Sequence, residues 1–144
     1  MTTDRFKRII MENVFKVTSP TYSIPTTYYI GISTSNTTSG EPASSTGYTR
    51  KSLTGLLAYN TSTYMISNTA GTDSGEIVFD NSQGSSDWFS ANSPAAYYII
   101  TDSSTVRSGN LVAYGSLQTP KPILAGDTAK INSGDLKRSI SDLS

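Results

Sequence analysis

The sequence predicts a mainly β fold, an antiparallel β-sandwich or small barrel of about seven to nine short strands with one N-terminal amphipathic helix. Ser and Thr supply 44 of the 144 residues, and Tyr outnumbers Phe nine to four. This composition favours pleated, half-exposed surfaces. Short apolar runs alternate with polar turns roughly every eight to twelve residues. The length fits one domain, which we take to span residues 1–144.

Helical periodicity is confined to the start of the chain. Phe6, Ile10 and Val14 recur every four residues, so their side chains fall on one face of a helix. We therefore predict an amphipathic helix within residues 3–16 and place the β-sandwich over residues 24–141.

The predicted strands follow in chain order. They cover residues 26–34, 48–57, 64–66, 76–80, 96–101, 111–117, 121–124, 128–131 and 135–140. We expect residues 96–101 and 111–117 to form a hairpin. Residues 121–124 and 128–131 form a second candidate pair. Pro120 places its segment at a sheet edge or a strand start, because proline cannot donate a ladder hydrogen bond.

Charge and residue usage exclude several classes of function. Eleven Lys and Arg balance eleven Asp and Glu, which argues against a nucleic-acid binder. Neither His nor Cys is present, so Cys/His zinc sites, Cys nucleophiles and triads with an imidazole base are excluded. No run approaches the roughly 18 apolar residues of a membrane span. We expect no catalytic residue, no metal, no cofactor, and neither a nucleic-acid nor a membrane partner.

Isolated carboxylates are the catalytic option that remains. Asp73 and Glu76 are the nearest to a pair, and Asp80 and Asp87 flank one loop. Loop spacing does not give their separation in space, and solvated turn residues are the interpretation we prefer. A hydrolase remains an alternative, which requires two of these four groups to converge in a pocket with a raised pKa.

Eight residues are candidates for binding a partner. They are Arg5, Phe6, Lys7, Arg8, Ile10, Val14, Trp88 and Phe89. The three cations either contact an acidic surface or form the solvated face of the helix. The apolar helix residues either complete the core or seal a subunit contact. The Trp-Phe pair, in a Ser/Gly-rich loop, either plugs one end of the sandwich or anchors a partner.

Several segments occur in an order that is similar to that of a known family. They are the helix 6–15, the run 28–35, Glu41 followed by Gly47-Tyr48-Thr49-Arg50, and the stretch 109–128 with its Thr119-Pro120-Lys121-Pro122. In this order, over about residues 4 to 140, they resemble small tailed-bacteriophage virion proteins. These are commonly labelled capsid decoration (cement) proteins or tail-fibre proteins.

The resemblance implies a non-enzymatic virion structural protein. We expect a capsid decoration protein on the capsid exterior, which binds the outer surface of the major capsid protein lattice and stabilises the head. Symmetric lattice sites favour a homo-oligomer, with a trimer expected. The alternative is a tail-fibre or baseplate-associated adhesion module that recognises host surface carbohydrate through Trp88, Phe89 and neighbouring tyrosines.

Overall fold

The structure is a computed structural model that describes residues 1–71 and 74–139. Within these ranges, nine strands form three antiparallel sheets. The four-stranded sheet has the order β2 (Lys51–Ser52), β1 (Tyr29–Ser33), β6 (Ala95–Thr101) and β7 (Leu111–Lys121). The three-stranded sheet has the order β3 (Ala58–Asn60), β4 (Met65–Ser67) and β9 (Lys137–Ser139). The two-stranded sheet pairs β5 (Ile77–Asp80) with β8 (Thr128–Ile131). Short 3-10 helices cover Thr38–Gly40 and Ser44–Thr46.

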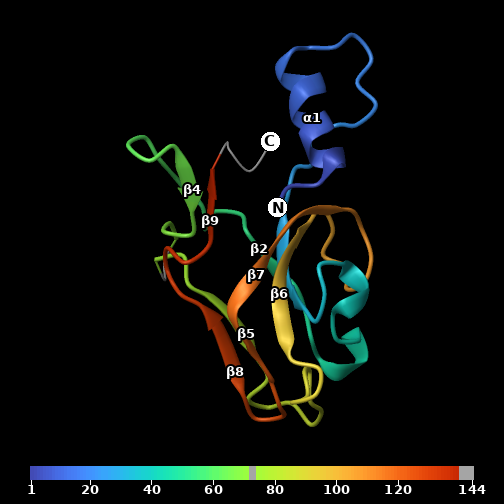
Figure 1. The fold of residues 1–144 in the computed structure, drawn as a ribbon, viewed down its shortest axis with the longest axis vertical. Coiled ribbons are helices and arrows are strands. Elements are labelled where there is room, and N and C mark those ends of the chain that lie inside the picture. The colour runs from blue at the N-terminus through green and yellow to red at the C-terminus, as the bar shows by residue number, and fades with distance from the viewer. Residues whose placement is uncertain (72–73, 140–144) are drawn as a thin grey trace.

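The predicted fold class is confirmed as a sandwich-like β fold with an N-terminal helix, and the described sheets form no closed barrel. The four-stranded sheet and the β5–β8 pair face each other across the core (Figure 1). Ile30 and Ile32 of β1 alternate onto the core face, as the sequence predicts. Ile77 and Phe79 of β5 meet them from the opposite layer.

The hairpin of β6 and β7 is confirmed, whereas the second predicted pair is wrong. β8 pairs with β5 instead, with Ile77 opposite Ile131. Ile123, in the other half of the predicted pair, forms an isolated bridge with Phe89. The chain between Ile123 and β8 turns sharply around Asn81, whose Nδ2 donates to Leu124 O at 3.0 Å. This contact directs β8 onto the distant β5.

Two strand predictions between β1 and β4 need correction. Of the predicted run 48–57, only Lys51 and Ser52 pair with β1, because the buried Tyr48 turns its hydroxyl toward the β1 edge instead. The strand β3 was not predicted, because residues 58–60 begin the largely polar sequence stretch 58–74. The last predicted run is observed as β9, and the part of it at Ile140 lies outside the described residues.

The N-terminus covers part of the open edge of β7. Thr2 bridges Ala113, and Thr3 N donates to Val112 O at 2.9 Å. Pro120 lies further along the same edge strand, where the missing N–H breaks no ladder bond, as predicted. This pairing fixes the point from which the helix leaves the sheet.

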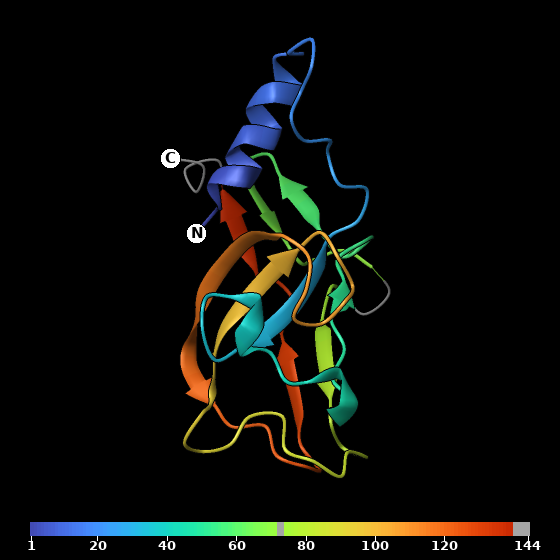
Figure 2. The same ribbon diagram turned by 90° about the vertical axis from the view of Figure 1, so that its right-hand side faces the viewer.

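The helix α1 (Asp4–Val14) confirms the N-terminal prediction. Thr3 is its N-cap, with Oγ1 accepting from Phe6 N at 3.4 Å. Ile9 is its buried residue, 2% exposed. The helix rises from the body as a protrusion, and the chain returns beside it before entering β1 (Figure 2). This eleven-residue element, the one α-helix in the described ranges, cannot span a membrane.

Candidate partner-binding surface

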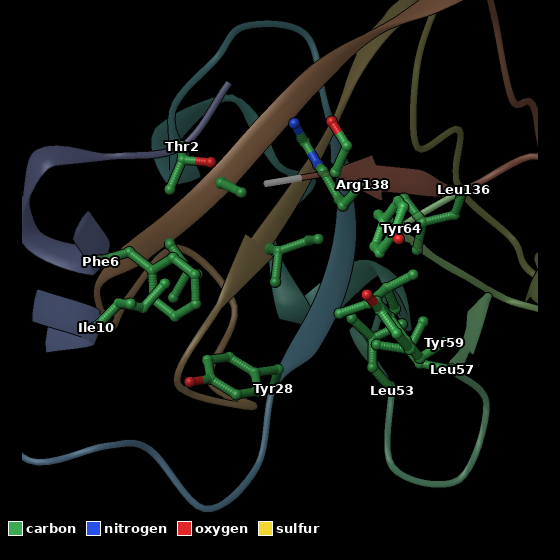
Figure 3. A pocket seen from close by; sticks show the side chains of 15 residues that line it. Thr2, Phe6, Ile10, Tyr28, Leu53, Leu57, Tyr59, Tyr64, Leu136 and Arg138 are labelled. Carbon is green, nitrogen blue, oxygen red and sulfur yellow. The ribbon is translucent and has the colours of Figure 1, made fainter. Parts of the chain in front are cut away.

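The return segment after α1 is held against the helix by two polar side chains. The Glu12 carboxylate accepts from Thr21 N at 2.7 Å. Asn13 Nδ2 donates to Ile9 O at 2.8 Å and to Tyr22 O at 3.1 Å. These contacts fix how the helix is rotated, so that Phe6 and Ile10 face across the end of the sandwich (Figure 3).

The face they present forms one wall of an open cavity of about 460 Å³, which we call the apolar groove. Its lining residues are Thr2, Phe6, Ile10, Tyr28, Leu53, Leu57, Tyr59, Tyr64, Ile66, Ile100, Val112, Ala113, Leu136, Arg138 and Ser139. Phe6 and Ile10 lie on one side, and Leu57, Tyr59 and Tyr64 lie on the other (Figure 3). The groove thus separates α1 from the three-stranded sheet.

The groove is ordered by contacts at its base. The rings of Phe6 and Tyr28 meet edge to face with centroids 5.9 Å apart. Arg138 lies over the ring of Tyr98 at 5.3 Å and donates to Tyr114 O at 2.6 Å, which binds β9 to the four-stranded sheet. Side-chain contacts therefore connect the elements that form the base of the groove.

Large apolar side chains lie exposed around this groove. Tyr64 is 66% exposed and Ile66 is 43% exposed, both beside the groove. Near the far end of α1, three further apolar side chains are exposed, Met11, Val14 and Phe15, which we call the helix ridge. Exposed large apolar side chains beside an apolar groove are typical of an interaction site on a small domain.

The structure separates the three predicted apolar helix residues. Phe6 and Ile10 line the groove, whereas Val14 lies beyond it and is 65% exposed. Of this stripe, Phe6 packs against the hydrophobic core, and the neighbouring Ile9 is the buried residue of the helix. The subunit-contact interpretation therefore fits Ile10 and Val14 better than the core interpretation, and it stays a prediction.

The basic cluster on α1 is engaged within the chain. Arg8 forms an ion pair with Glu12 one turn later, which lowers the pKa of that carboxyl. Lys7 Nζ lies 3.6 Å from an aspartate of the first turn. Arg5 NH2 lies 3.9 Å from Asp102 Oδ2. These contacts favour the solvated-face interpretation of the cluster over an acidic partner surface.

Trp88 and Phe89 lie in the core rather than on a binding surface. They are 9% and 2% exposed, and Trp88 Nε1 donates to Thr46 O at 3.0 Å. The Trp88 ring meets Tyr48 edge to face at 5.4 Å. Of the two predicted roles, closing the sandwich fits these contacts. A sugar-binding face built on this pair lacks the exposed aromatic surface that it requires.

The carboxylates of the hydrolase alternative each make local contacts. Glu76 Oε1 lies 3.1 Å from a lysine of β8, and Asp87 Oδ1 accepts from a backbone N–H. Hydrogen bonds from Ser82 lower the pKa of Asp80, the opposite of the raised pKa that a general acid needs. Asp73 lies outside the described residues. Within the described ranges, no three Asp or Glu side chains gather as a metal site would require.

Sequence reasoning missed the second wall of the groove. Leu53, Leu57, Tyr59, Tyr64 and Ile66 come from residues that were interpreted as strand or polar loop, without a role in binding. A usable signal was present, since apolar residues recur in a stretch otherwise rich in Ser, Thr and Gly. Their assembly with α1 depends on the pairing of β4 with β9, which no local pattern shows.

Comparison with known families gives one finding for the chain. A family model described as "Podophage GP4 fiber I protein gp80" matches residues 2–139, which include the helix, all described strands and the apolar groove. No curated protein matches the chain.

Proposed function

The chain belongs to the family of the podophage GP4 fiber I protein gp80, and from this membership we propose that it is a non-enzymatic structural subunit of a phage fibre. The family makes it a phage virion structural protein. The sequence left two places in the virion open, the fibre and the capsid exterior. We favour the fibre, because the matching family is described by the name of a fibre protein.

The apolar groove is the feature of the structure that best supports a role in subunit contact. A fibre subunit must contact its neighbours or its carrier through surface that is exposed in the single chain. The groove and its rim provide such surface, since Tyr64 and Ile66 lie open to solvent. Burying exposed apolar side chains is the main driving force of protein association.

We assign the groove to contact with a second copy of the same chain. The occupant must be apolar, and the helix ridge of Met11, Val14 and Phe15 offers exposed apolar side chains on a protruding element of this chain. A ridge from one copy in the groove of the next is a head-to-tail contact, which closes into a ring when the rotation allows. We propose a trimer of this kind.

The assembly is tested by light scattering coupled to gel filtration. The expected result is a trimer for the unaltered protein and a monomer for Ile66→Thr, which removes apolar surface from the groove rim. Leu124→Thr is the matched control, because Leu124 is exposed to a similar extent (41% against 43%) and does not line the groove. An unaltered protein that is still monomeric at about 100 µM would contradict self-association through this surface.

The position in the virion is tested by co-sedimentation with isolated tails and with undecorated capsids of the same phage. Saturable binding to tails alone supports the fibre assignment. Saturable binding to capsids, near a fixed ratio to the major capsid protein, would instead support decoration of the capsid exterior.

A further inference from the structure

Tyr64, on the rim of the apolar groove, is held in a backbone conformation that a tyrosine rarely adopts. Its φ is 54°, in the left-handed region that Gly or Asn usually occupies. The residue lies on the wall opposite Phe6 and Ile10 (Figure 3) and is 66% exposed. A strained backbone beneath an exposed side chain points to a role beyond the fold of the single chain.

The turn between β3 and β4 accounts for this conformation. Asn60 and Met65 are paired at the ends of the two strands, so residues 61–64 form the loop that joins them. Asn60 Oδ1 accepts from Ser62 N at 2.9 Å and from Thr63 N at 3.0 Å, which fixes the first part of the loop. Tyr64 is the last loop residue and completes the turn into β4. A glycine at this position would complete the same turn without strain, so the fold does not require an aromatic side chain there.

Phe15 is a second exposed aromatic residue on a fixed backbone, at the C-terminal end of α1. It is the C-cap of the helix and is 70% exposed. The helix ends in a Schellman motif, in which Val17 N donates to Glu12 O at 2.9 Å and Lys16 N donates to Asn13 O at 3.3 Å. Lys16 takes the left-handed conformation of this motif, with a φ of 52°. The motif therefore holds Phe15 at the end of the protruding α1 (Figure 2).

We propose that Phe15 of one copy packs against Tyr64 of the next copy, as the anchor pair of the head-to-tail contact. This inference rests on the proposed trimer and names the two residues that hold it together. Aromatic residues are enriched among the anchors of protein interfaces, since each buries a large area and orders few side-chain torsions. Backbones that are already fixed lose less freedom on association. An offset or edge-to-face ring pair also adds attraction beyond the area it buries.

Cross-linking between copies tests the contact directly. The chain contains no Cys, so single-cysteine variants can be labelled without interference. Val17→Cys and Thr63→Cys place a thiol next to each anchor and keep both rings. The two variants, co-expressed and treated with a short bis-maleimide, are expected to give a cross-linked product with the mass of two chains. Val17→Cys with Leu124→Cys is the matched control and is expected to give none, because Leu124 does not line the groove.

Tyr64→Gly separates the two roles of the residue, because it removes the ring and also relieves the backbone. On dilution, light scattering is expected to show dissociation at a concentration at least about tenfold higher than for the unaltered protein. The unfolding temperature of the dilute monomer is expected to stay the same or rise, since the strain is lost. Tyr64→Phe is the control, because it keeps the ring and the strained backbone, and it is expected to assemble within about threefold of the unaltered protein.

The outcomes distinguish this contact from the trimer itself. A trimer that gives no product with Val17→Cys and Thr63→Cys, or that forms equally well in Tyr64→Gly, would overturn the anchor pair and leave the trimer standing. A lower unfolding temperature of Tyr64→Gly would overturn the pair as well, because the ring would then serve the fold of its own chain. An unaltered protein that is monomeric would overturn the proposed trimer and the anchor pair together.

Discussion

Arg50 donates two parallel hydrogen bonds to Glu41, from Nε to Oε1 at 2.9 Å and from NH2 to Oε2 at 2.6 Å, and both side chains are fully buried. The remaining Arg50 nitrogen, NH1, donates to Thr101 Oγ1 and to two backbone carbonyls of the loop after β6. Arg107 N donates to Glu41 Oε2 at 2.9 Å. This pair therefore joins the long loop after β1 to the β6–β7 hairpin.

Replacing Glu41 is expected to destabilise the whole fold. Glu41→Gln leaves the Arg50 charge buried without its counter-ion, which costs about 3–5 kcal/mol of unfolding free energy. The measurement is urea unfolding followed by fluorescence of Trp88. Glu76→Gln is the control, because its pair with Lys130 is partly exposed and is worth about 0–1 kcal/mol. Equal losses in the two variants would contradict the role assigned to the buried pair.

Gly31 is expected to tolerate no side chain. A Cβ at this position would stand 2.5 Å from Glu41 Oε1 and 2.7 Å from the Tyr48 hydroxyl. Gly31→Ala therefore displaces the buried pair and costs about 1–3 kcal/mol or more. Gly126→Ala has open space around the new methyl group, although its φ of 95° adds strain. If thermal unfolding shows Gly31→Ala to be the milder of the two, the close packing is not the constraint.

Stability is expected to fall at alkaline pH through Tyr48. Burial, with the nearby Glu41 charge, raises the pKa of its phenol well above the usual value. An exposed phenol loses its proton near pH ~10. Above that pH the unfolded chain binds fewer protons than the folded chain, so the stability present below it is lost at up to ~1.4 kcal/mol per pH unit.

Tyr48→Phe separates this effect from general alkaline damage. The variant is less stable at pH 7, because Ile32 N loses its hydroxyl acceptor at 2.8 Å. Its unfolding free energy should nevertheless decline less steeply above pH ~10 than that of the unaltered protein. Parallel declines in urea titrations at pH 9 to 11 would show that another group is responsible.

Ile9 and Val14 are expected to respond differently to truncation. Ile9→Ala opens a cavity under the helix and costs about 2–5 kcal/mol, whereas Val14→Ser on the exposed helix ridge changes stability by less than about 0.5 kcal/mol. In the proposed trimer, Val14→Ser instead weakens assembly. Thermal unfolding at low concentration and light scattering at high concentration measure the two effects apart. A large loss of monomer stability in Val14→Ser would place that side chain in the core.

Local patterns allowed α1 and the β6–β7 hairpin to be predicted, because each depends on neighbouring residues. The β5–β8 pair joins Ile77 to Ile131, and its alternative partner was nearer in sequence, so proximity favoured the wrong pairing. Burial of Trp88 depends on the carbonyl of Thr46, which only the folded loop brings within reach. A Ser/Gly-rich setting does not show whether an aromatic residue finds such a partner.

Only one wall of the apolar groove could be predicted from the sequence, again because local patterns do not show distant pairings. Phe6 and Ile10 follow from helical spacing, whereas the opposite wall requires β9 to pair with β4, as Lys137 does with Ser67. The Glu41–Arg50 pair was noticed only as part of a motif, since a sequence does not show that two charged residues nine positions apart are both buried.

Asn68 is expected to hold this opposite wall in position. Its side chain is fully buried, with Nδ2 donating to Gly75 O at 2.8 Å and to Asn132 O at 2.9 Å, while Oδ1 accepts from Leu136 N at 2.9 Å. Asn68→Ala leaves these three backbone groups without that partner. Each costs about 1–3 kcal/mol when it is buried and unsatisfied, so the variant should lose at least about 2 kcal/mol.

The loss should be concentrated at the apolar groove, because Leu136 precedes β9 and lines it. Hydrogen exchange of the Leu136 amide should accelerate in Asn68→Ala more than exchange of the Ile99 amide in the four-stranded sheet. Asn60→Ala is the control, since the Asn60 side chain is exposed and accepts only from two backbone N–H groups of its own turn. Uniform acceleration across both sheets would mean that Asn68 supports global stability rather than the wall, because the unfolding reaction would then be the shared cause.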